Sequence, residues 1–192
     1  MSPLETTAVG LALAYIALAM RQSRLCWVAA IISAAIYIAI FTEVKLYMEA
    51  GLQLVYIGMA IVGWILWGKD DSDKALAVTT RPLQFHLIAI AGISIAAACT
   101  GFLLSHFTDA ARPYVDSTTT VAAIVCTWMV TRKILENWLY WIVINCVSVW
   151  LFMDRGLDLT SGLFVLYAVL SVVGYFTWRR SLLQQICYGD PH

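Results

Sequence analysis

The sequence predicts an all-α membrane protein of seven transmembrane helices, arranged 3+1+3 as two parallel three-helix repeats joined by one linker helix. Three observations lead to this prediction. Hydrophobic residues make up 61% of the 192 residues and charged residues 12%, whereas soluble domains average about 45–50% and about 25%. Seven apolar stretches follow one another along the chain. Two segments of the chain also match each other at a constant offset, without a gap.

The apolar stretches have about the length that a helix needs to cross the hydrocarbon core of a bilayer, and the first is the shortest. They cover residues 6–20, 25–42, 47–67, 82–105, 114–131, 136–153 and 158–178. Pro82 and Pro113 stand where the fourth and fifth begin, a position that tolerates proline because the first helical N–H groups have no partner anyway. The N-terminus carries Glu5 and no basic residue before the first stretch, so we do not interpret it as a cleaved signal peptide.

The basic residues indicate the orientation of these spans. Seven spans place nine Lys and Arg residues on one side of the membrane and three on the other. Loops rich in Lys and Arg stay in the cytoplasm. We therefore expect the N-terminus outside, the C-terminus in the cytoplasm, and the long loop at 68–81 in the cytoplasm.

The internal repeat relates residues 27–67 to residues 138–178, and ten of the 41 positions are identical. The matched positions include Trp27/Trp138, Gly63/Gly174 and Trp67/Trp178. The prediction is one membrane domain over 1–192, with repeat one at about 6–67, a linker helix at about 82–105 and repeat two at about 114–178. Equivalent positions are four spans apart, so both repeats run in the same direction. Parallel repeats occur in transporters, whose substrate site lies between the halves near mid-membrane.

Several functions are excluded by what the spans lack. Every Asp, Glu, Lys and Arg lies in a loop or near a span end, which favours a passive facilitator over an ion-coupled carrier, although backbone carbonyls can also hold sodium. His86, near the start of the fourth span, is interpreted as interfacial rather than as a proton relay. The five cysteines show no CxxC spacing and no His/Glu/Cys cluster is present; we expect no metal, no cofactor and no enzyme. A net charge of zero excludes a nucleic-acid partner.

The candidate binding residues centre on the stretch ENWLYWIVINC at 136–146. Trp138, Trp141 and Asn145 share one face if this stretch is helical. An amide inside hydrocarbon needs a partner, so Asn145 serves either a ligand or a neighbouring helix. The two tryptophans serve either a ligand or an interfacial belt.

Other polar and aromatic side chains within the spans extend this candidate site. The further candidates are Asn137 and Ser148 in the sixth span, Gln53, Tyr56 and Trp64 in the third, and Tyr167 in the seventh, the repeat mate of Tyr56. Two indole faces with amides form a slot for a flat polar ring, and stacking strengthens if that ring is cationic. The residues therefore favour an aromatic cation or a nucleoside-like solute.

These residues also resemble a known family. The GWILW motif at 63–67, the spacing of Gln53 and Tyr56, and above all RKILENWLYWIVIN at 132–145 are similar to the PnuC-type vitamin transporters. These are the nicotinamide riboside carriers and their thiamine- and riboflavin-carrying relatives. The resemblance covers about residues 20–178. It implies the fold of SWEET sugar transporters, and substrate contacts at Trp138, Trp141, Asn145 and Gln53.

The same resemblance implies how such a protein works. It implies facilitated diffusion of nicotinamide riboside across the bacterial inner membrane, a homotrimer, and a cytoplasmic kinase that traps the entering vitamin as its phosphate. The connection at 106–114 is shorter than in the nicotinamide riboside carriers, so a thiamine carrier remains the alternative. A sugar facilitator of the same fold and a non-transporting membrane scaffold are the further alternatives.

Overall fold

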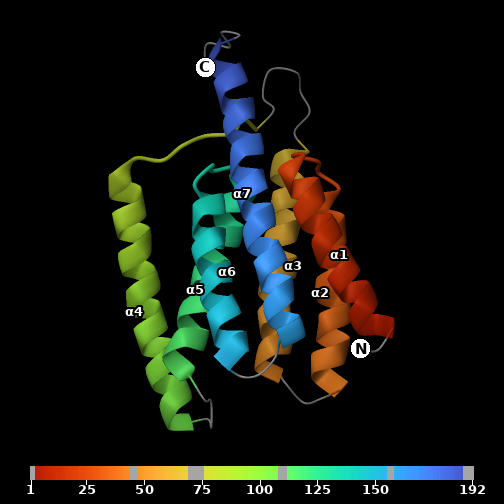
Figure 1. Ribbon diagram of the computed structural model, residues 1–192, viewed down its shortest axis with the longest axis vertical. Helices are drawn as coiled ribbons and strands as arrows, with labels where there is room; N and C mark the ends of the chain where they lie inside the picture. Colours follow the sequence, from red (N-terminus) through yellow and green to blue (C-terminus); the bar gives the residue numbers. More distant parts are fainter. Residues whose placement is uncertain (1–2, 44–46, 69–75, 108–111, 155–157, 188–192) are drawn as a thin grey trace. The chain divides into compact units, whose positions relative to one another are not determined.

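A computed structural model describes residues 3–43, 47–68, 76–107, 112–154 and 158–187 of the chain (Figure 1). Within these residues the secondary structure consists of seven α-helices and one isolated bridge between Thr79 and Ile134. The helices are α1 (Pro3–Met20), α2 (Cys26–Glu43), α3 (Tyr47–Trp67), α4 (Leu83–Phe107), α5 (Pro113–Thr131), α6 (Asn137–Asp154) and α7 (Asp158–Cys187). The prediction of an all-helical protein with seven helices is confirmed. The bounds agree closely with the seven stretches, except that α7 continues to Cys187, beyond the expected end at 178.

Four of these helices contain segments that are long and apolar enough to cross a membrane. These segments are Cys26–Glu43, Ala50–Trp67, Leu83–Phe107 and Ser161–Cys187, and the apolar parts of α1 and α6 are shorter, at Thr6–Met20 and Asn137–Leu151. Helix α5 carries Asp116 in its first turn, followed by one serine and three threonines, which lowers its hydropathy. Length and composition therefore support four of the seven predicted spans directly.

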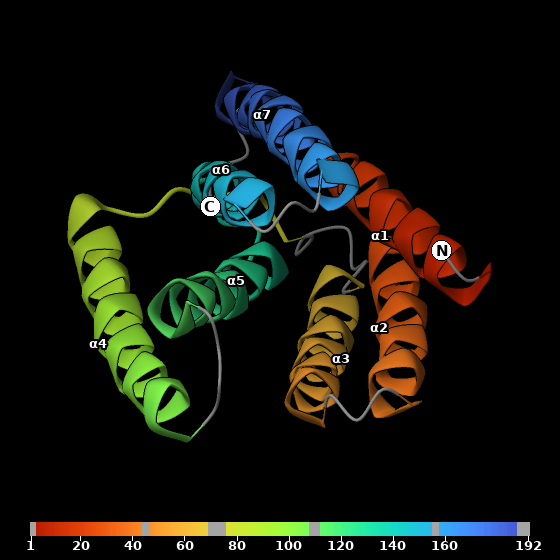
Figure 2. The ribbon, with the colours of Figure 1, turned by 60° about the horizontal axis from the view of Figure 1, so that its bottom comes forward.

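The chain divides into two compact units. The first comprises Met1–Val78, Val130–Lys133 and Phe176–His192, and therefore contains α1, α2 and α3. Within this unit α2 lies between α1 and α3 (Figure 2). The second comprises Thr79–Met129 and Ile134–Tyr175. Within it α5 lies between α4 and α6 (Figure 1), and Ile93, Ala122, Cys126 and Ile144 form a buried apolar cluster among these three helices.

In the first unit, Trp27 of α2 packs directly against Gly63 of α3. The Trp27 side chain is 1% exposed, and a Cβ built at Gly63 would come within 2.6 Å of Trp27 Cδ2. Tyr15 of α1 and Trp67 of α3 complete the group, with ring centroids 5.9 Å and 5.2 Å from Trp27. The three helices therefore meet around one indole, and glycine is required where α3 passes it.

The second unit contains the same arrangement at the repeat-related positions. Trp138 of α6 is 4% exposed, and a Cβ built at Gly174 of α7 would come within 2.6 Å of Trp138 Cε3. Two pairs that match in sequence thus make the same contact in the structure. The contact brings α6 and α7 close together in the second unit, just as the Trp27–Gly63 contact brings α2 and α3 close together in the first.

The turns that precede α2 and α6 also have the same backbone conformation. Gln22 has φ 54° and Lys133 has φ 49°, a left-handed conformation that is uncommon for residues other than glycine. The N–H of Gln22 donates to Ala19 O at 2.9 Å, and the N–H of Lys133 donates to Val130 O at 3.0 Å. In both places a helix ends, reverses through one left-handed residue, and leads into the helix that carries the packed tryptophan.

Two indole N–H groups in the first unit reach the carboxyl ends of helices. Trp67 Nε1 donates to Thr131 O at 3.2 Å, and Trp178 Nε1 donates to Ala19 O at 3.0 Å. The last carbonyls of a helix have no N–H partner within it. Trp67 gives Thr131 O a donor, and Trp178 is a second donor to Ala19 O beside the N–H of Gln22. Lys133 Nζ lies 4.8 Å from the centroid of the Trp67 ring, and burial lowers the pKa of this lysine below its ordinary value.

The tryptophan–glycine contacts predict how glycine substitutions change stability. Gly63→Ala and Gly174→Ala each insert a methyl group into the space of an indole ring, and overpacking of this kind costs about 1–3 kcal/mol. We expect each variant to unfold about 2–12 °C below the wild type, as measured by fluorescence-monitored thermal unfolding in detergent.

Matched controls lie on the same two helices. A Cβ added at Gly58 of α3 or at Gly162 of α7 meets no atom within 4 Å, so Gly58→Ala and Gly162→Ala should leave the midpoint unchanged or raise it, because alanine favours helix. Equal midpoints for all four variants would contradict the packing described above.

Candidate substrate-binding residues

Asn137 lies at the first position of α6 and is fully buried. Its side chain is 0% exposed, and its Nδ2 donates to Ile134 O at 2.6 Å. Cys126 of α5 approaches the backbone oxygen of Asn137, with Sγ at 3.3 Å. These contacts hold the turn that leads into α6, so Asn137 contributes to the position of the candidate site through the backbone.

The two tryptophans of α6 have different neighbours. Trp138 is buried against Gly174 of α7, whereas Trp141 is half-buried and packs against the apolar cluster that contains Ala122 and Cys126 of α5. The structure therefore gives Trp138 a clear packing role. Part of the Trp141 surface remains exposed.

Asn145 makes an interhelical hydrogen bond inside the second unit. Its side chain is 4% exposed, and its Nδ2 donates to Ser171 Oγ of α7 at 3.3 Å. Ser171 Oγ in turn donates to the backbone oxygen of Tyr167 at 2.8 Å. Asn145 thus bonds a neighbouring helix, which the sequence left open as one of two possibilities. Its Oδ1 and second N–H are the groups that it can offer to a solute.

Two further candidates belong to the same pair of helices. Ser148 lies three residues after Asn145 on α6 and is 5% exposed. Tyr167 of α7 is half-buried, and its backbone oxygen receives the Ser171 hydroxyl. The structure therefore brings Asn145 and Tyr167 together through Ser171. Ser171 was not among the residues predicted from the sequence. Its hydroxyl lies four residues after Tyr167 in an apolar span, and this position could have indicated it.

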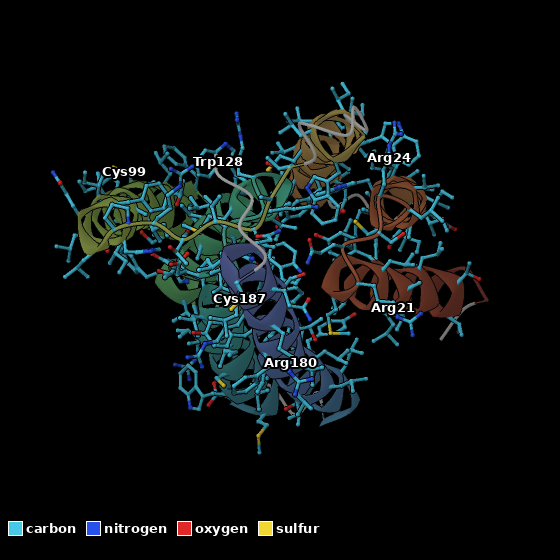
Figure 3. All side chains as sticks on the ribbon, turned by 90° about the horizontal axis from the view of Figure 1, so that it is seen from above. Arg21, Arg24, Cys99, Trp128, Arg180 and Cys187 are labelled. Carbon is cyan, nitrogen blue, oxygen red and sulfur yellow. The ribbon has the colours of Figure 1, made fainter. Side chains whose placement is uncertain are left out.

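The candidates on α3 lie in the first unit. Gln53 and Tyr56 are half-buried. The ring of Trp64 is covered on one face by Arg24, whose Cζ lies 3.8 Å from the ring centroid. Arg24 lies in the turn two residues before α2 begins and extends toward α3 (Figure 3). The chain thus supplies its own cation to one face of Trp64.

His86 belongs to a polar cluster at the starts of α4 and α6. Its Nδ1 is 3.0 Å from the Tyr140 hydroxyl, and its Nε2 is 3.9 Å from Glu136 Oε1. The same carboxylate oxygen accepts the N–H of Arg81 at 3.2 Å. The sequence indicated an interfacial histidine but did not show its partners. No group of three or more His, Cys, Asp and Glu that could bind a metal is found in the described part of the chain.

Apolar helices long enough to span a bilayer indicate an integral membrane protein. Residues 2–180 match the family described as nicotinamide mononucleotide transporter, and the chain belongs to this family. The family consists of membrane transporters rather than enzymes. The resemblance found in the sequence is thereby confirmed.

Curated relatives from three bacteria show the breadth of this similarity. The chain is 25% identical over 177 residues to the nicotinamide riboside transporter PnuC of Escherichia coli, covering 79% of this chain and 74% of that protein. It is 29% identical over 167 residues to the protein of the same name from Neisseria mucosa, covering 78% and 62% of the two chains. It is 28% identical over 174 residues to the riboflavin/roseoflavin transporter RibM of Streptomyces davaonensis, covering 88% and 80%.

A solved structure has the same fold. The crystal structure of the vitamin B3 transporter PnuC superposes with a TM-score of 0.74 at 23% sequence identity, covering 94% of this chain and 82% of that chain.

Proposed function

We propose that this protein carries nicotinamide riboside across the bacterial inner membrane by facilitated diffusion. Family membership and two relatives named as nicotinamide riboside transporters support this substrate. The observation that carries the proposal is the face of α6 on which half-buried Trp141 lies one turn from an oriented amide, Asn145. An indole face attracts a cationic pyridinium ring, and an amide can pair with the carboxamide of nicotinamide.

Passive transport is the second part of the proposal. The charged residues of the sequence lie in loops or near helix ends, and the His86–Glu136 pair lies at the starts of two helices. A carrier driven by protons or sodium usually needs an acid within the membrane. A cytoplasmic kinase that phosphorylates the solute would then make uptake unidirectional, as the resemblance implies.

The architecture is proposed as 3+1+3, with α4 as the linker helix and with two repeats in the same orientation. The helix bounds support this arrangement. Helix α6 (137–154) has the same length as α2 (26–43), and the two are separated by the same offset that aligns Trp27 with Trp138. The start of α7 at position 158 follows the start of α3 at position 47 by that offset too. The matched tryptophan–glycine contacts and left-handed turns also support it. The N-terminus outside, the C-terminus in the cytoplasm and a homotrimer belong to the same proposal.

The alternatives differ in the ring that the site accepts. RibM is named for riboflavin and roseoflavin, and thiamine is the alternative that the short connection at 106–114 suggested. A sugar facilitator would need more groups that match hydroxyls than the described face of α6 provides.

Uptake into liposomes tests the substrate and the mechanism together. We expect purified protein to exchange labelled nicotinamide riboside by counterflow without any ion gradient, because no carboxylate lies at mid-span in the sequence. Thiamine, riboflavin and glucose serve as competitors on the same preparation.

Two outcomes would contradict this expectation. Counterflow that only thiamine or riboflavin inhibits would assign another vitamin. Accumulation above equilibrium under an imposed proton or sodium gradient would replace facilitated diffusion by ion coupling.

Cysteine labelling tests the orientation. In a background with the exposed Cys99, Cys146 and Cys187 replaced by serine, Ala77→Cys should react with an impermeant maleimide only after the cells are opened. Glu43→Cys should react in intact cells. Both side chains are exposed, so access alone decides the result, and reversed labelling would reverse the topology.

Substitutions on α6 separate binding from folding. Trp141→Ala should weaken binding of nicotinamide riboside about 5- to 150-fold, since aromatic stacking contributes about 1–3 kcal/mol, and Trp141→Phe should recover part of the loss. Trp138→Ala should also lower the unfolding midpoint, because its buried ring leaves a cavity against Gly174. Calorimetry and thermal unfolding of each variant provide the two measurements.

Trp150 provides the control on the same helix. Its side chain is 51% exposed, so Trp150→Ala should leave the affinity unchanged. If Trp141→Ala lowered the midpoint and left the affinity intact, Trp141 would be a packing residue and the proposed slot would be wrong.

A further inference from the structure

The hydrogen bonds of Ser171 restrict the orientation of the neighbouring Asn145 amide. It lies on α7, is 3% exposed, and its Oγ donates to Tyr167 O at 2.8 Å. This is the bond that a helical serine commonly makes to the carbonyl four residues earlier. A hydroxyl carries one hydrogen, so Ser171 Oγ can act only as an acceptor toward Asn145.

That restriction determines the orientation of the Asn145 amide. Asn145 Nδ2 lies 3.3 Å from Ser171 Oγ and donates to it. Rotation of the amide by half a turn would bring Oδ1 against an oxygen whose hydrogen is already committed. Two acceptors would then face each other in a buried place, which is unfavourable. The amide is therefore held with its N–H toward α7 and its Oδ1 turned away from Ser171.

We propose that Ser171 is a positioning residue that sets the specificity of the carrier through Asn145. The held amide offers the solute one acceptor, Oδ1, and one remaining N–H. A primary carboxamide has the complementary donor and acceptor, whereas a carboxylate has acceptors alone and meets Oδ1 unfavourably. Ser171 thus makes the site prefer a neutral carboxamide to a carboxylate on the same ring. This inference rests on the proposed function, which places Asn145 beside the solute.

A second serine of α7 separates this role from simple helix packing. Ser161 is 4% exposed, and its Oγ donates to Val149 O of α6 at 3.2 Å. It joins the same two helices with one hydroxyl but has no bond to Asn145. Ser161→Ala therefore removes an α6–α7 hydrogen bond without changing the amide.

The experiment compares nicotinamide riboside with nicotinic acid riboside, which differ in the carboxamide and carboxylate groups. Their dissociation constants are measured by calorimetry on the full-length wild type, Ser171→Ala, Ser171→Thr and Ser161→Ala, and unfolding midpoints are recorded alongside. We expect the wild type to prefer the carboxamide. Ser171→Ala should lower that preference about fivefold, the effect of one neutral hydrogen bond. Ser171→Thr should restore the preference, because threonine makes the same backbone bond, and Ser161→Ala should retain it.

The outcomes distinguish this inference from the function on which it rests. If the wild type binds neither riboside, the proposed function is wrong and the inference is wrong with it. If the wild type prefers the carboxamide and Ser171→Ala keeps the full preference, the inference alone is overturned. Equal losses for Ser171→Ala and Ser161→Ala would also overturn it. Should Ser171→Ala unfold, Ser171→Cys, which keeps the volume with a weak donor, should lower the preference in its place.

Discussion

The packing of a tryptophan against a glycine is the interaction on which the rest of the structure depends. Trp27 on Gly63 and Trp138 on Gly174 leave no room for a Cβ, so each pair brings two helices into close approach. In the second unit this approach sets the register of α6 against α7. Because Asn145 lies two turns beyond Trp138, and Ser171 one turn before Gly174, the same contact places the amide within reach of the hydroxyl.

A small number of polar groups pair with one another between these packed helices. Polar side chains inside hydrocarbon need partners, and Asn145 has one in Ser171, whose own hydrogen is taken by Tyr167 O. This pair of bonds holds the Asn145 amide in one orientation and leaves its Oδ1 and one N–H outside both bonds. The charged groups, by contrast, lie near the ends of the helices. Glu136 and His86 lie at helix starts, and Arg24, in the turn before α2, lies against Trp64.

The two tryptophans of α6 are close in sequence but have different surroundings in the structure. The spacing of Trp138 and Trp141 indicates one face and therefore one function. In the structure Trp138 is buried against α7, while Trp141 borders the cluster on α4 and α5 and remains partly exposed. The repeat already contained this distinction, because Trp138 matches the buried Trp27 whereas Trp141 has an alanine, Ala30, as its mate.

The sequence by itself determined the number of helices, their limits apart from the end of α7, and the membrane setting, because hydrophobic length is a local property that the bilayer thickness dictates. It also determined the family, through the residues around Trp138, Trp141 and Asn145. Only the tertiary structure decided which partner each polar group has. Ser171 is 26 residues from Asn145, and the partners of His86 are likewise distant in sequence: Tyr140 of α6, and Glu136 directly before that helix. No periodicity links such residues, since their contacts exist only after the helices pack and each buried donor must find an acceptor.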